Sequence, residues 1–196
     1  MNSKRFMSTK QMVLGAVMTA LVIVFQLLAT FTAFFGPFST AIALVPIAIG
    51  ACLCGPIVGA WLGLVFALVV LFTGGASLFY PFSEIGTIVT VVLKGMACGF
   101  ASGIVYKALS KVNDVLAAVI AAIICPVVNT GVFLLGSMTF FYNSAQKIGE
   151  LVGISGAGFA VFWGLAMANF LFELGMCAVL SPVIVKIINI AKKQFK

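Results

Sequence analysis

The fold is decided by residues 40–72, TAIALVPIAIGACLCGPIVGAWLGLVFALVVLF, an apolar run that contains no charged residue and is broken at Gly55-Pro56. Because proline cannot continue a helix and the residue before it avoids the helical region, the run predicts two helices, at about 40–54 and 57–72. At about 1.5 Å per residue they are roughly 21 to 24 Å long, shorter than the roughly 30 Å hydrocarbon core of a bilayer. We therefore expect these two short helices to pack together as a hairpin.

The apolar character of this run extends along the whole chain. Of the 196 residues, 63% are hydrophobic and 8% are charged, whereas soluble domains are roughly half apolar and a quarter charged. Longer apolar segments flank the hairpin at about 11–31, 85–109, 115–141 and 157–190, and each is long enough to cross a bilayer. The sequence predicts an all-α membrane protein, a single domain over residues 1–196 built as a bundle of six transmembrane helices.

The basic residues predict how this bundle is oriented. Lys147 alone falls on one side of the predicted membrane and Lys94 lies inside a span, while the other basic residues fall on the opposite side: Lys4, Arg5, Lys10, Lys107, Lys111, Lys186, Lys192, Lys193 and Lys196. Because basic residues concentrate in short cytoplasmic loops, both termini are predicted to be cytoplasmic. The positive charge thus indicates topology and attraction to the anionic lipid bilayer, and we expect no nucleic-acid partner.

The chain lacks the residues that most enzymes and metal sites need. It contains no histidine, which is the commonest general base and metal ligand, and no Gly-rich phosphate-binding loop. The five cysteines lie in apolar segments without the spacing of a metal site, which indicates small buried side chains: Cys52, Cys54, Cys98, Cys125 and Cys177. We expect no catalysis, no ATP hydrolysis, no metal and no cofactor.

Two glycine series predict where helices come close. Each series repeats at a spacing of four residues, which places its members on one helix face: Gly55, Gly59 and Gly63, and Gly95, Gly99 and Gly103. Such stripes of small residues allow backbones to approach closely within a membrane. We favour packing within the bundle, with a dimer face as the alternative.

Lys94 is the one basic side chain predicted to lie within a span. Charged groups are costly in hydrocarbon, so a lysine there is a candidate functional residue with a partner to be found. One alternative is an anionic group on a ligand, such as a carboxylate. The other is an ion pair inside the protein, with Glu173 or Glu84, and the two alternatives are compatible.

Polar residues within other spans extend this candidate site. Asn169 and Glu173 stand four residues apart on one helix face, Asn129 follows a proline by three residues, and Gln26 lies in the first span. Measured from the outer helix ends, Lys94 and Gln26 lie roughly 10 Å deep and the other three roughly 18 to 24 Å deep. We expect these side chains to converge on a substrate-binding site in the outer half of the bundle.

The predicted outer loops are rich in phenylalanine and tyrosine. In the loop over residues 73–83, Phe79 and Tyr80 follow Gly74-Gly75, which we interpret as a hinge. An interfacial belt explains part of this enrichment, but belts occur at both surfaces and favour Trp and Tyr. The excess on one side predicts an apolar lid that closes over a small amphipathic ligand.

The first helix carries Ala16-xxx-Ala20, a pair that alone indicates only ordinary packing. Together with about 200 residues, six helices, cytoplasmic ends, the hairpin around residues 46–59 and a long loop over a polar site, it resembles the substrate-binding S component of an energy-coupling factor (ECF) vitamin transporter. The resemblance implies that Ala16 and Ala20 dock against a transmembrane coupling subunit. It also implies two cytoplasmic ATPase subunits, location in the bacterial plasma membrane, and a binding subunit that is not an enzyme.

The same resemblance implies that the substrate is a water-soluble vitamin, captured at the outer face before the protein reorients in the membrane. Lys94 favours a carboxylate-bearing ligand, such as pantothenate or a folate, over riboflavin or thiamine. A cobalt or nickel substrate is disfavoured because the chain has no N-terminal histidine. The alternative function is a proton-coupled carrier that works alone, with Glu173 and Lys94 as its titrating pair.

Overall fold

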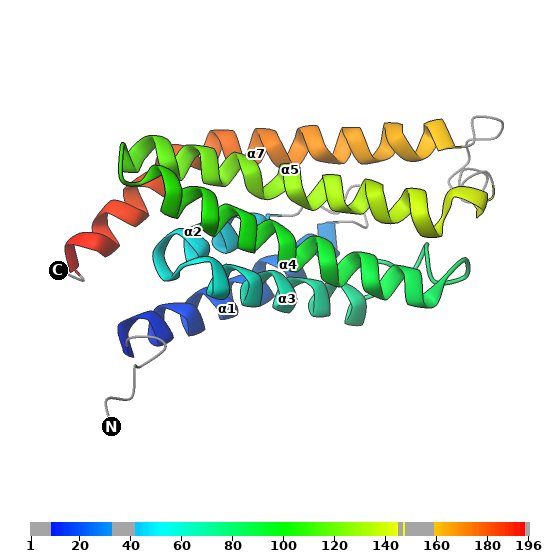
Figure 1. Ribbon diagram of the computed structural model, residues 1–196. Helices are drawn as coiled ribbons and strands as arrows, with labels where there is room; N and C mark the ends of the chain where they lie inside the picture. The colour runs from blue at the N-terminus through cyan, green and yellow to red at the C-terminus, as the bar shows by residue number, and fades with distance from the viewer. Residues whose placement is uncertain (1–8, 33–41, 145–146, 148–158, 195–196) are drawn as a thin grey trace, which may run out of the picture.

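The computed structural model describes residues 9–32, 42–144, 147 and 159–194, which form a bundle of helices without a strand (Figure 1). The helices are α1 (Thr9–Thr32), α2 (Leu44–Cys54), α3 (Pro56–Phe72), α4 (Glu84–Leu109), α5 (Asp114–Phe140) and α7 (Phe159–Gln194), with a short 3-10 turn, η2 (Tyr142–Ser144), after α5. Of these, α1, α4, α5 and α7 are long and apolar enough to cross a membrane, whereas α2 and α3 are shorter. The prediction of an all-α, multi-pass membrane protein is confirmed.

The helix boundaries differ from the predicted ones by more than two residues at two places. The helix α2 begins at Leu44 instead of residue 40, because Ile42 and Ala43 form a turn, and residues 40–41 lie outside the described part. The helix α7 continues to Gln194, four residues beyond the predicted end at 190. The segment after Ile190 contains lysine and glutamine, which favour helix in water, so α7 does not have to stop where its apolar segment stops.

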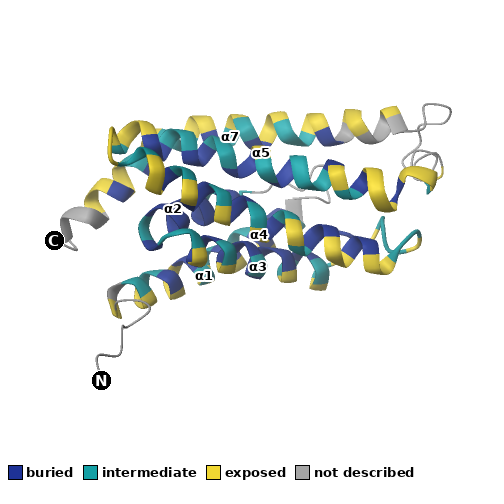
Figure 2. Cartoon of the chain, viewed as in Figure 1, coloured by how far each residue is buried: buried dark blue, intermediate teal, exposed yellow. Residues whose placement is uncertain are grey.

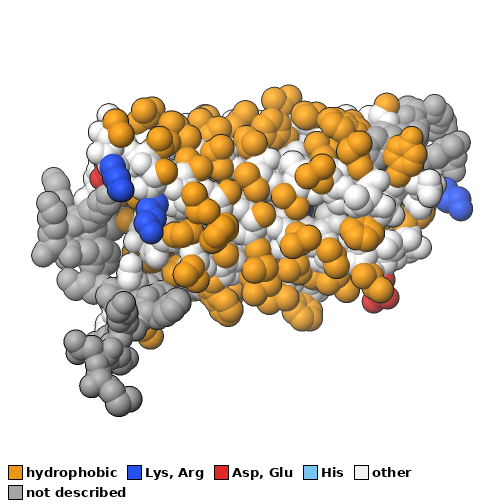
Figure 3. Space-filling model, in the orientation of Figure 1, with side chains coloured by type: hydrophobic (Ala, Val, Ile, Leu, Met, Phe, Trp, Pro, Cys, Tyr) orange, Lys and Arg blue, Asp and Glu red, His pale blue; other side chains and the backbone are white. Residues whose placement is uncertain are grey.

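Different segments of the chain lie at the two ends of the bundle. The start of α1, the end of α7 and the turn between α4 and α5 lie at one end, which we call the terminal end (Figure 1). The segment 73–83 and η2 lie at the other, which we call the loop end. On the face shown in Figure 3, charged side chains occur at the two ends and hydrophobic side chains cover the surface between them, as a bilayer requires. Figure 2 shows these outward helix faces as exposed.

The predicted break between α2 and α3 is present. Gly55 adopts φ 94° and ψ 174°, a backbone conformation that residues other than glycine rarely adopt. Pro56 occupies the first position of α3, where its missing N–H costs no helical hydrogen bond. The chain therefore reverses direction here and α2 packs against α3 as the expected hairpin.

The glycine series of α3 and α4 face each other. A Cβ atom added to Gly59 would collide with the carbonyl oxygen of Gly99, and one added to Gly63 would collide with that of Gly95. Only glycine permits this approach of two helix backbones. The predicted packing within the bundle is confirmed for these residues.

The helix α2 lies at the centre of the terminal-end half. It contacts α1, α3, α4, α5 and α7, and its residues Leu44, Ile47 and Ala48 are fully buried. Its first residue reaches the middle of α5, where the Cys125 thiol lies 3.9 Å from the Leu44 carbonyl oxygen. The described part of α2 therefore fills only the terminal-end half of the bundle interior.

Candidate functional site

Four of the predicted polar residues lie at similar depth in the loop-end half. Lys94 comes from α4, Asn129 from α5, and Asn169 and Glu173 from α7. Counted from the loop-end termini of their helices at about 1.5 Å per residue, they lie about 15 to 21 Å deep. Lys94 is thus nearly level with the other three, deeper than predicted. We call these four residues the polar cluster.

Glu173 is the centre of the polar cluster. Its side chain is 3% exposed, and each of its carboxylate oxygens accepts a hydrogen bond from an amide. The Nδ2 atom of Asn169, one helical turn away, donates to Oε1 at 2.7 Å, and the Nδ2 atom of Asn129 donates to Oε2 at 3.4 Å. The two amides fix the orientation of the carboxylate, and the second joins α5 to α7.

The interior near the polar cluster contains polar atoms without a partner. The Oδ1 atom of Asn129 and the Oγ1 atom of Thr90 are buried and have no hydrogen-bond partner among the described residues. Leaving such an atom unpaired costs about 1 to 3 kcal/mol, so each of these atoms is a candidate to bind a further partner. Thr90 was not predicted as a site residue, although its spacing of four residues from Lys94 places both on one face of α4.

Lys94 forms neither of its two predicted ion pairs. Its charge interacts with that of Glu173, but no carboxylate oxygen of the described residues lies within 4.0 Å of its ammonium group. Glu84 is exposed at the loop-end start of α4. The ammonium of Lys94 lies instead 5.2 Å from the centroid of the Phe133 ring, a cation–π contact.

The aromatic residues of the loop end reach the same ring. The Phe79 ring contacts Phe133 edge-on, with centroids 5.7 Å apart, and contacts Phe141 at 5.4 Å. Tyr80 is partly buried and packs against the main core. Through Phe133, the segment 73–83 is therefore connected to Lys94. Phe133 was not predicted, because one phenylalanine in an apolar helix carries no distinct signal.

Gln26 is not brought into the polar cluster by a hydrogen bond within the described part of the chain. It is buried in α1, and its Oε1 atom has no hydrogen-bond partner among the residues that the structure describes. The helix α1 packs mainly on α2 and α3, and the Thr30 hydroxyl of the next turn donates to the Thr73 hydroxyl at 3.3 Å. The predicted role of Gln26 in binding stays a prediction.

A layer of thiols lies directly beneath the polar cluster. Cys98, Cys125 and Cys177 are each four residues, or one helical turn, nearer the terminal end than a member of the cluster on the same helix. All three are at most 1% exposed, as predicted, and all are free thiols. Together with the start of α2, this layer separates the polar cluster from the terminal end of the bundle.

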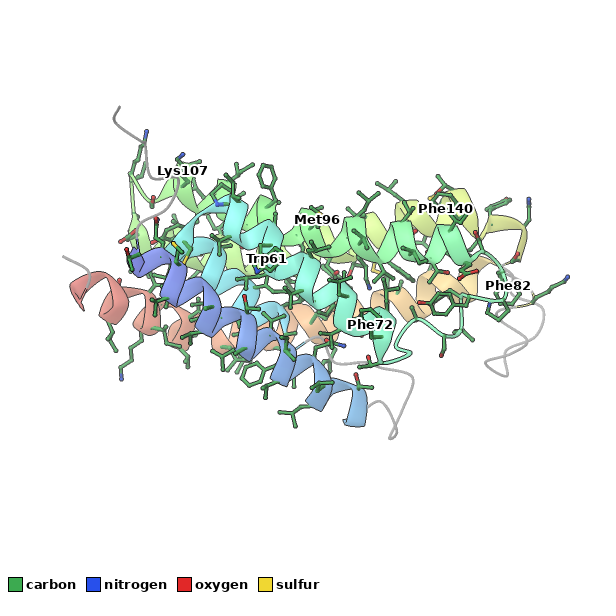
Figure 4. All side chains as sticks on the ribbon, turned by 90° about the horizontal axis from the view of Figure 1, so that it is seen from below. Trp61, Phe72, Phe82, Met96, Lys107 and Phe140 are labelled. Atoms are coloured by element: carbon green, nitrogen blue, oxygen red, sulfur yellow. The ribbon has the colours of Figure 1, made fainter. Side chains whose placement is uncertain are left out.

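The two alanines predicted to dock a partner lie on the outside of the bundle. Ala16 and Ala20 are exposed on α1, and Val13 and Val17 of the same helix are exposed beside them. The neighbouring α3 holds the other face of α1, and Figure 4 shows Trp61 of α3 beside this helix. The two alanines are therefore open to contact with another membrane protein.

Comparison with known proteins places this arrangement in context. A family model described as "ECF transporter, substrate-specific component" matches residues 10–185. No curated protein and no solved structure matches the chain significantly.

Proposed function

This chain belongs to the ECF transporter substrate-specific components, and we propose that it captures a small water-soluble vitamin or related micronutrient between the loop end and the thiol layer. The family makes the chain a substrate-binding subunit of a transporter, and such subunits are not enzymes. The part of the site that chooses the substrate is, in this proposal, the polar cluster together with Thr90.

The proposal rests on hydrogen-bonding groups of the polar cluster that have no partner within the described part of the chain. The Lys94 ammonium has three N–H donors and forms no hydrogen bond within the described part of the chain, and Asn129 has an acceptor without a donor. A ligand carboxylate would accept from Lys94, and a charge-assisted hydrogen bond is roughly twice as strong as a neutral one. Pantothenate or a folate is therefore favoured over riboflavin or thiamine.

Delivery requires partners that this chain does not contain. We propose that the loaded protein reorients in the bacterial cell membrane with a transmembrane coupling subunit, driven by two cytoplasmic ATPase subunits. The exposed Ala16 and Ala20 support a docking face on α1, because small residues allow a partner helix to approach closely. The terminal end, which holds the start of α1 and the end of α7, faces the cytoplasm in this arrangement, and Phe79 and Tyr80 belong to the lid over the loop end.

Native mass spectrometry tests the proposal. The protein is expressed in rich medium, purified in detergent and examined for a small molecule at one copy per chain. We expect such a mass in the wild type and in Lys107→Ala, whose side chain is exposed at the terminal end, and its loss in Lys94→Ala. If no molecule is found, even after a panel of water-soluble vitamins is added, the alternative of a proton-coupled carrier working alone gains the support that the binding subunit loses.

A further inference from the structure

Lys94 and Glu173 are opposite charges inside the bundle that do not touch. Their charges interact, yet no direct ion pair forms within 4.0 Å. Opposite charges attract strongly where water is excluded, and the lysine side chain is long and flexible. If the two residues served only to neutralise each other, the lysine would be expected to close on the carboxylate.

Separate neighbours hold the two charges apart. Glu173 is fixed by Asn169 at 2.7 Å and by Asn129 at 3.4 Å, and Lys94 lies over the Phe133 ring at 5.2 Å. A carboxylate has about four lone-pair positions, of which the two amides use two. Each charge is thus positioned by groups that leave part of its hydrogen-bonding capacity unused.

The unused capacity is complementary to a molecule that both accepts and donates. A carboxylate alone would satisfy Lys94 but would bring a second negative charge toward Glu173, and a cation alone would be repelled by Lys94. The Nδ2 atom of Asn129 donates to Glu173, and the Oδ1 atom of the same side chain, which has no partner among the described residues, adds a second acceptor on the Glu173 side. Donors are therefore required near Glu173 and an anion near Lys94.

We propose that the ligand carries two functional groups of opposite hydrogen-bonding character: its carboxylate accepts from Lys94, and a hydroxyl, amide or amine of the same molecule donates to Glu173 and Asn129. This inference rests on the proposed function, because it assumes that the polar cluster is the substrate site. It goes further in requiring two groups of opposite hydrogen-bonding character on one ligand, and in assigning a residue to each.

Named compounds of different chemistry test the requirement. The purified full-length protein is titrated with pantothenate and folate, which carry a carboxylate and donors, with nicotinate and lipoate, which carry a carboxylate without donors, and with thiamine, a cation. Binding is followed by thermal unfolding and native mass spectrometry. We expect a compound of the first class to bind at least about tenfold more tightly than every compound of the other two. Equal or tighter binding of nicotinate, lipoate or thiamine overturns the proposal.

Two substitutions test which residue binds the carboxylate of the ligand and which binds its donor group. Panthenol matches pantothenate except that an alcohol replaces the carboxylate. If pantothenate binds, Lys94→Met should remove the preference for pantothenate over panthenol, whereas Glu173→Gln should weaken both at least about tenfold and preserve the preference. Lys107→Met is the control for removal of an exposed lysine. Unchanged affinity in Glu173→Gln, with an unchanged elution profile and unfolding temperature, overturns the assignment.

The failure of this inference is distinguishable from the failure of the proposed function. If none of the compounds binds but the protein carries a molecule through purification, the functional groups of that molecule decide: the presence of both groups supports the inference and the lack of either overturns it. If nothing binds and nothing is carried, the proposed function fails and the inference fails with it.

Discussion

The seam between α3 and α4 should not tolerate even one added methyl group. In Gly63→Ala the new Cβ would collide with the carbonyl oxygen of Gly95 and lie 2.5 Å from its carbonyl carbon. Cβ atoms are essentially never found closer than about 3.0 Å to another heavy atom. Because both obstacles belong to the backbone of α4, no side chain can rotate away, and the two helices have to separate.

The expected cost follows from two opposing effects. Overpacking of an interior costs about 1 to 3 kcal/mol. Alanine is favoured over glycine in a helix by about 1 kcal/mol, which offsets part of that cost. We therefore expect Gly63→Ala to lower the free energy of unfolding by up to about 2 kcal/mol. Since Gly95 follows Lys94 directly, the displacement of α4 should also weaken retention of the ligand.

Gly131→Ala is the matched control, because a Cβ at Gly131 of α5 meets no atom within 4 Å. It should be neutral or stabilising by up to about 1 kcal/mol, from helix preference alone. Both variants are compared with the wild type by denaturant titration in detergent, and ligand retention is measured by native mass spectrometry. If Gly63→Ala were as stable as Gly131→Ala, the close approach of α3 and α4 would be refuted.

Other changes follow from the same structure. Phe79→Ala should speed ligand release, because it removes the ring contacts with Phe133 and Phe141. The control Phe72→Ala, at a side chain that is 86% exposed, should not change the off-rate. Equal off-rates of the two variants in chase experiments would indicate that Phe79 belongs to the interfacial belt and not to a lid. Replacing Ala16 and Ala20 together by leucine should abolish uptake in cells that contain the coupling module and leave ligand retention intact, because the change adds bulk only to an outward face; normal uptake would count against docking there. Ser83→Ala should destabilise the start of α4 by about 1 kcal/mol, measured by denaturant titration, since the Ser83 hydroxyl accepts from a first-turn amide at 3.1 Å.

Local signals in the sequence were enough to predict most of the helices. The break at Gly55-Pro56 and the facing glycine series depend on steric rules that hold wherever these residues occur. The central position of α2 could not be predicted, because a helix that is apolar on every side gives no direction for its packing. The contacts of α2 with five other helices exist only in the tertiary structure.

The candidate site could likewise be predicted from the sequence only in part. Lys94, Asn129, Asn169 and Glu173 stood out because polar groups are rare and costly in hydrocarbon, and the structure places them at one level. The partner of Lys94 could not be read from the sequence, since the choice between a carboxylate and an aromatic ring depends on positions within a few ångströms. Phe133 and Thr90 escaped notice for a related reason, because such residues are common in membrane helices and only their neighbours distinguish them.

The length of α2 explains why the polar cluster lies where it does. The Cys125 thiol touches the first residue of α2, and Asn129 lies one helical turn farther along α5 toward the loop end. One more turn of α2 would therefore bring apolar side chains against Asn129 and Glu173. The preceding residues, Thr40 to Ala43, are themselves compatible with a membrane helix, yet Ile42 and Ala43 form a turn. Because α2 ends at the thiol layer, its apolar side chains stay away from the buried charges, and the proposed binding of a polar ligand at the cluster depends on that separation.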